Sequence, residues 1–94
     1  MERHVLAIHA LAEGANEDAV KETLGRVAEA AADRGWRAIE TFYSLERGRA
    51  YTYAETDTAD RVRDTLDDLG LAGVEVLEAE RVFTELLHRP RRSR

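Results

Sequence analysis

The chain has 94 residues, of which 44% are hydrophobic and 35% are charged, a composition that suits one globular domain and excludes an intrinsically disordered chain. It contains no cysteine, which excludes disulfides, thiolate metal sites, iron–sulfur clusters and cysteine nucleophiles. The formal net charge of −5 argues against nucleic acid as a partner.

The predicted elements follow one another in the order β-α-β-β-α-β. Short runs rich in β-branched and aromatic residues predict the strands, and apolar residues at helical spacing predict two amphipathic helices. Asn16 and Thr58 are good N-cap residues, while Gly35 and Gly70 supply helix stops. The predicted strands span residues 5–11, 36–46, 49–56 and 74–87, and each helix lies between its cap and its stop.

This element order predicts an α+β domain of the ferredoxin-like type. Two similar β-α-β halves favour a four-stranded antiparallel sheet with both helices on one face. We expect a single domain over residues 1–88, followed by a basic, disordered tail over residues 89–94.

We also expect a cytoplasmic protein with no membrane partner. The first apolar run, over residues 5–11, lacks the strongly basic lead and the cleavage site of a signal peptide. No apolar run approaches the roughly 18 residues that a membrane-spanning helix needs.

The second face of the predicted sheet is unusually apolar. If Arg47-Gly48 is a two-residue turn, Phe42 pairs with Tyr53 and Glu40 pairs with Glu55. A shift of one residue in the turn would reverse half of this arrangement. In the two-residue register one face carries aromatic side chains and two carboxylates, namely Glu40, Phe42, Ser44, Tyr51, Tyr53 and Glu55.

Self-association is the simplest cover for such a face. Two sheets packed face to face form a dimeric α+β barrel, whose interior can hold a pocket. We therefore expect a homodimer through the sheet, with Phe42, Tyr51 and Tyr53 as candidate ligand-binding residues.

His9 is the most suggestive candidate for chemistry. If Leu6 and Ile8 lie under the helices, His9 shares the other face with Glu40 and Glu55. A histidine with two carboxylates is a plausible site for a divalent ion such as nickel or zinc. The same group could act as an acid–base pair.

Structural alternatives stay open for these residues. His9 could be a partly buried histidine bonded to a neighbouring side chain. Glu40 and Glu55 could be separated by a different register, or neutralised by an arginine such as Arg37 or Arg81.

A resemblance to a known family rests on four segments of the chain. They are residues 38–42 (Ala-Ile-Glu-Thr-Phe), 48–56 (Gly-Arg-Ala-Tyr-Thr-Tyr-Ala-Glu-Thr), 60–65 (Asp-Arg-Val-Arg-Asp-Thr) and the pair Gly70-Leu71. In these segments the chain resembles a family of small bacterial ferredoxin-like proteins of largely unknown function, some of them described as nickel-binding. The resemblance implies dimerisation through the sheet.

The chain departs from that family at the softer metal ligands. Glu40, Thr52 and Thr65 stand where the family tends to have histidine, cysteine and histidine. Glu55 is kept, and His9 lies in the first strand, where some relatives carry histidines. The resemblance therefore implies metal binding only through these last two residues.

Three functions stay in view. The first is a homodimeric binding protein that holds a divalent metal ion or a small ligand at the sheet face. The second is a cofactor-free enzyme of the dimeric α+β barrel type (a cyclase, isomerase or monooxygenase), with His9 as acid–base and Tyr51 or Tyr53 orienting the substrate. The third is an interaction module with the basic tail as a docking arm.

Overall fold

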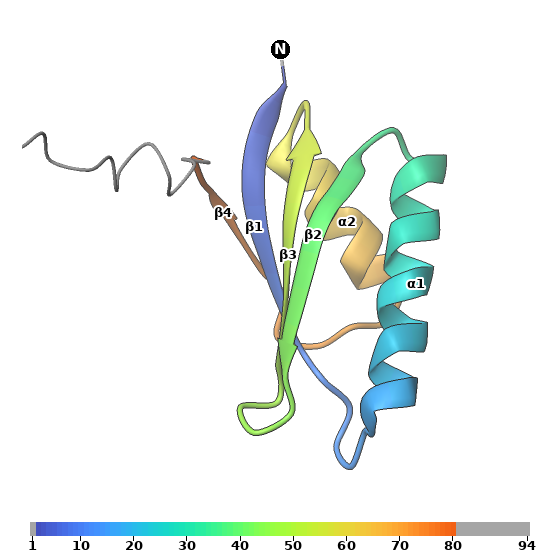
Figure 1. The fold of residues 1–94 in the computed structure, drawn as a ribbon. Coiled ribbons are helices and arrows are strands. Elements are labelled where there is room, and N and C mark those ends of the chain that lie inside the picture. The colour runs from blue at the N-terminus through green and yellow to red at the C-terminus, as the bar shows by residue number, and fades with distance from the viewer. Residues whose placement is uncertain (1, 81–94) are drawn as a thin grey trace, which may run out of the picture.

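The computed structural model describes residues 2–80 and contains the predicted elements in the predicted order (Figure 1). Within those residues, no helix is long and apolar enough to cross a membrane. Arg81, the end of the predicted last strand and the basic tail lie outside the described residues. The strands are β1 (Arg3–Ala10), β2 (Arg37–Ser44), β3 (Arg49–Thr56) and β4 (Glu75–Glu78), and the helices are α1 (Glu17–Asp33) and α2 (Ala59–Asp68).

The four strands form one antiparallel sheet in the order β2-β3-β1-β4. Both helices cover the same face of this sheet, with α1 and α2 side by side (Figure 1). The predicted α+β, ferredoxin-like fold class is confirmed.

Local signals set the ends of the helices as the sequence predicts. The side chain of Asn16 accepts a hydrogen bond of 2.8 Å from the backbone N–H of Ala19, and the Thr58 hydroxyl accepts one of 3.1 Å from Asp60. Gly35, with φ +81°, follows the end of α1, in a left-handed conformation that glycine adopts without steric cost.

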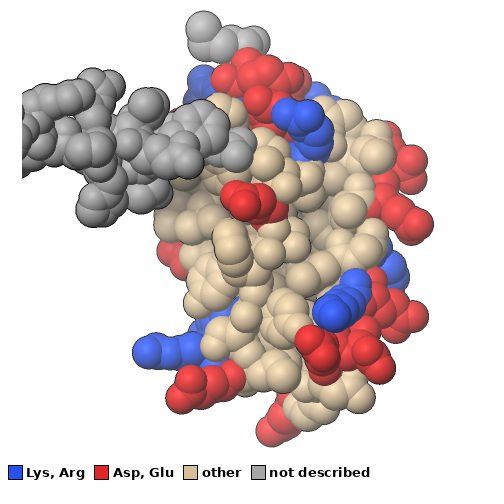
Figure 2. Space-filling view, viewed as in Figure 1, with Lys and Arg blue, Asp and Glu red and all other residues tan. Residues whose placement is uncertain are grey.

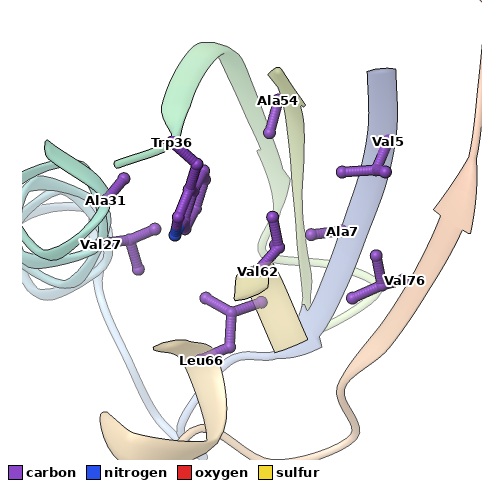
Figure 3. Packing of buried hydrophobic residues seen from close by; sticks show 9 residues of the cluster. All are labelled: Val5, Ala7, Val27, Ala31, Trp36, Ala54, Val62, Leu66 and Val76. Atoms are coloured by element: carbon purple, nitrogen blue, oxygen red, sulfur yellow. The ribbon is translucent and has the colours of Figure 1, made fainter. Parts of the chain in front are cut away.

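The hydrophobic core lies between the helices and the sheet (Figure 3). Trp36 anchors it, and its indole N–H donates a 3.0 Å hydrogen bond to the hydroxyl of Thr65. Strands β1 and β3 contribute small side chains to this side. The core cluster consists of Val5, Ala7, Val27, Ala31, Trp36, Ala54, Val62, Leu66 and Val76.

The face of strand β1 that packs against the helices is not the one that we expected. Val5, Ala7 and His9 are the buried set, with His9 only 1% exposed. The prediction that Leu6 and Ile8 lie under the helices is therefore wrong. β1 carries apolar residues on both faces, so their alternation does not select one, and the choice is made by pairing with β3.

The connection between β2 and β3 is longer than a two-residue turn. Ser44 pairs directly with Arg49, and the residues from Leu45 to Gly48 form the loop between them. The N–H of Gly48 donates a 2.8 Å hydrogen bond to the carbonyl of Ser44, and the N–H of Arg47 donates to the Ser44 hydroxyl at 3.1 Å.

The longer loop changes which residues of β2 and β3 pair with each other, but not which face of the sheet each side chain occupies. Phe42 lies opposite Tyr51, and Glu40 lies opposite Tyr53. The predicted pairs of Phe42 with Tyr53 and of Glu40 with Glu55 are therefore wrong. The shift is an even number of residues, and side chains alternate with a period of two, so these residues still share one face.

A β-bulge between Ala38 and Glu40 interrupts the pairing of β2 with β3. Ile39 is the extra residue, which places Arg37 opposite Glu55. Without the bulge the regular register would place Ala38 there instead. Bulges commonly re-aim side chains in this way, and here the result is an arginine beside the carboxylate.

Candidate functional site

The face of the sheet away from the helices, called the open face below, carries a row of large apolar side chains. Phe42 is 57% exposed and Leu77 is 45% exposed. In the view of Figure 2, uncharged residues extend across the middle of the molecule and charged residues lie mostly toward its margins. Cross-strand pairing assigns to the open face His4, Leu6, Ile8, Glu40, Phe42, Tyr51, Tyr53, Glu55, Glu75 and Leu77.

A polar cluster of His4, Arg37 and Glu55 lies at one end of the open face. His4 Nε2 donates to Glu55 Oε2 at 3.2 Å, and Arg37 Nη2 donates to Glu55 Oε1 at 2.6 Å. The hydrogen bond from His4, together with that from Arg37, holds the pKa of Glu55 below its ordinary value. The rings of His4 and Tyr53 are 5.4 Å apart between centroids. The cluster thus joins a neutralised carboxylate to an aromatic surface.

Most of the predicted site residues lie together on this face. Phe42 and Tyr51 are cross-strand partners, as are Glu40 and Tyr53. Glu55 continues the same side of β3. The predicted ligand-binding set is therefore brought together on the open face.

His9 is separated from the two glutamates. It faces the helices and lies opposite Ala50, whereas His4 is the histidine opposite Glu55. His4 is not among the candidate residues predicted from the sequence. Its even spacing from Leu6 and Ile8 places it on the same side of β1 as these residues, but the alternation alone does not say which side faces the helices.

The predicted metal donors do not fit a single ion. His9 lies on one side of the sheet and Glu40 and Glu55 lie on the other. Among residues 2–80, no group of three or more His, Cys, Asp or Glu side chains is arranged to hold a metal ion. Arg37 already supplies a positive partner for Glu55, which is one of the structural alternatives considered from the sequence.

No protein-family model and no curated protein matches this chain. Solved structures do match. The protein SCO4226 from Streptomyces coelicolor A3(2) is similar with a TM-score of 0.73 and 16% identity, over 85% of this chain and 99% of that one. The 30S ribosomal protein S6 from Thermotoga maritima gives a TM-score of 0.63 and 10% identity, over 84% of this chain and 89% of that one.

The likeness is one of fold. At these identities the two structures support the small ferredoxin-like architecture and nothing finer, because one fold hosts many functions. The nickel binding implied by the family resemblance belongs among the proposals below.

Proposed function

We propose that this protein is a homodimeric small-molecule-binding protein, in which the open faces of two copies pack together and hold a ligand between them. The observation that carries this proposal is the exposed apolar row on that face. Phe42 lies beside Tyr51, and Leu77 lies beside Leu6. Each exposed side chain therefore has an apolar or aromatic side chain next to it on the adjacent strand. An apolar patch of this kind is typical of a contact surface.

A second copy of the chain is the simplest cover for the open face. A chain of 94 residues buries only a modest share of its own surface and gains stability from association. A two-fold contact uses the same surface patch of both copies. Because Phe42 and Leu77 lie on the outer strands β2 and β4, a sheet-to-sheet contact covers both.

The ligand in this proposal lies against Phe42, Tyr51 and Tyr53. Aromatic rings offer flat apolar surfaces with a polar group at the edge. The hydrogen-bonded pair of His4 and Glu55 lies beside Tyr53. A small organic molecule with a flat apolar part and one polar group suits these surfaces best.

Light scattering coupled to size-exclusion chromatography tests the dimer. The wild type is expected at twice the mass of the 10.6 kDa chain. Phe42→Glu is expected to run as a monomer with an unchanged circular dichroism spectrum, because each copy would bury an unpaired carboxylate in the interface. Leu45→Glu is the matched control, since Leu45 is 50% exposed but lies in the hairpin loop. A monomeric wild type, or a dimeric Phe42→Glu, overturns the proposal.

A divalent ion such as nickel or zinc is the alternative ligand for the same face. Its donors would be His4 and Glu55 in place of a set containing His9, and a two-fold contact would double their number. Arg37 opposes this, because its guanidinium neutralises Glu55 and repels a cation.

Thermal melts with nickel, zinc and chelator decide between the two ligands. A metal-dependent rise in Tm that His4→Ala removes and His9→Ala retains favours the ion. If no ion shifts the Tm, the organic ligand stands as the proposal.

A cofactor-free enzyme of the dimeric α+β barrel type is the second candidate, and the hydrogen bond between His4 and Glu55 favours it. A carboxylate that accepts from one imidazole nitrogen fixes the tautomer and leaves the other nitrogen as a base. His4 then takes the role that the sequence suggested for His9. Conversion of a bound ligand that is lost in His4→Gln, with binding retained, distinguishes this enzyme from a binding protein.

A further inference from the structure

We propose a second binding site on the helix side of the sheet, where His9 accepts a hydrogen bond from a small, largely apolar molecule that carries one O–H or N–H group. The site is a cavity of about 200 Å³. It lies where the end of β1 meets the first half of α1 and the segment after α2. Its walls include His9, Ala19, Val20, Thr23, Arg26 and Leu71.

His9 offers a hydrogen-bond acceptor that the described residues leave unused. Its Nδ1 lies 3.3 Å from the carbonyl oxygen of Ala10, and only a protonated nitrogen can bond to a carbonyl. In the neutral imidazole Nε2 is then the acceptor. Nε2 is buried and has no hydrogen-bond partner among residues 2–80. Burial also lowers the pKa of His9, which keeps the ring neutral near pH 7.

An unpartnered buried nitrogen is costly, because it has lost its hydrogen bonds to water and gained none from the protein. The strand neighbours of His9 on the helix side are apolar. Its cross-strand partner is Ala50, and Ala7 precedes it on the same side of β1. A leucine at this position would fill similar space without the cost. A ligand with a hydrogen-bond donor supplies the missing partner.

The size and lining of the cavity indicate the class of molecule. A water molecule takes about 30 Å³ of liquid volume, while an apolar protein cavity of about 150 Å³ binds benzene. A cavity of about 200 Å³ therefore suits a single substituted ring. Its alanine, valine and leucine side chains favour an apolar body, and the buried His9 favours one donor group. A small phenol combines these properties.

The cavity also has an approach from solvent. Arg26 is exposed and Thr23 is half-buried, whereas His9 is buried. The lining thus combines polar side chains at the surface of α1 with the buried His9. A phenol entering with its hydroxyl first reaches His9 and keeps its ring among the aliphatic side chains.

A titration with phenol and anisole tests the site on the full-length protein. The two probes share the ring, but anisole has a methoxy group in place of the hydroxyl and cannot donate. Phenol is expected to bind about tenfold more tightly and to shift the His9 Nε2 resonance in ¹⁵N NMR spectra. Equal affinity for both probes, an unchanged His9 resonance, or no binding of phenol overturns the proposal.

Two variants locate the effect. His9→Leu is expected to bind phenol and anisole equally, because it keeps the volume and removes the acceptor. Ala19→Leu adds bulk to the cavity wall without changing His9, and is expected to weaken both probes. If His9→Leu does not fold, the effect of Ala19→Leu still decides, and unaltered phenol binding in that variant overturns the site.

This site is independent of the dimer proposed above. It lies under the helices of one chain, so phenol binding needs no second copy. A monomeric wild type that binds phenol through His9 contradicts the proposed dimer and supports the cavity. A dimeric wild type that does not bind phenol supports the proposed dimer and contradicts the cavity.

Discussion

Arg37 Nη2 lies 2.6 Å from Glu55 Oε1, across the bulge that Ile39 makes in the pairing of β2 with β3. His4 reaches the other oxygen of the same carboxylate from β1 at 3.2 Å. Three strands therefore meet at Glu55. Because of the bulge, Arg37 and not Ala38 lies opposite Glu55. The arginine neutralises the carboxylate, which could otherwise attract a cation.

Glu55→Gln is expected to remove a small, pH-dependent contribution to the free energy of unfolding. The pKa of Glu55 is lowered in the folded protein, so its contribution is full above the unfolded pKa and is lost as pH falls through the folded pKa. The effect is small because the ion pair is partly exposed. Urea denaturation from about pH 7 to about pH 3 measures it.

Glu40→Gln is the matched control for that experiment. Glu40 lies on the same face and has no ion-pair partner among the described residues. Its neutralisation is expected to leave the unfolding free energy near pH 7 unchanged. Equal behaviour of the two variants across the pH range would contradict the cluster at Glu55.

His9 is expected to make the protein less stable as pH falls below the ordinary histidine range. Burial lowers the pKa of His9 from 6.5, so between that value and the folded pKa the unfolded chain binds more protons than the folded one. The stability contribution of the neutral ring is full above 6.5 and decreases as pH falls below it. Urea denaturation of wild type and His9→Leu should show a shallower pH dependence in the variant. Parallel curves would show that His9 does not titrate as described.

Thr65→Val is expected to destabilise the protein by about 1–3 kcal/mol, because it leaves the buried indole N–H of Trp36 without its acceptor. Thr65→Ser keeps the hydroxyl and is expected to retain most of the stability. Fluorescence of Trp36, the one tryptophan in the chain, follows unfolding in both variants. A valine variant as stable as wild type would mean that the hydrogen bond contributes nothing.

Thr52→Val is expected to change stability by less than about 1 kcal/mol, in the stabilising direction. Thr52 is also a fully buried threonine, but its hydroxyl has no hydrogen-bond partner among residues 2–80. Replacing an unpaired polar group with an apolar one of the same shape removes a desolvation cost. The same denaturation assay measures it beside Thr65→Val. Losses of equal size at the two positions would refute the assigned hydrogen bonding.

The element order, the helix caps and the aromatic side chains that β2 and β3 place on the open face could all be predicted from the sequence. Asn16 and Thr58 cap helices through contacts within three residues, and such local preferences are written in short segments. Strand β3 spans the predicted residues 49–56. Small and aromatic residues alternate along β3, so Tyr51 and Tyr53 lie on the same face of the strand. The predicted and the observed hairpin registers differ by an even number of residues, so both place these tyrosines on the open face.

The tertiary structure decided the position of His9, the bulge at Ile39 and the cluster around Glu55. Each depends on the register between strands that are distant in the sequence, as with His4 and Glu55. β1 is apolar on both faces, so its own alternation is consistent with either orientation, and only packing against β3 and the helices selects one. Local patterns thus determine which elements form, while long-range pairing determines which side chains meet.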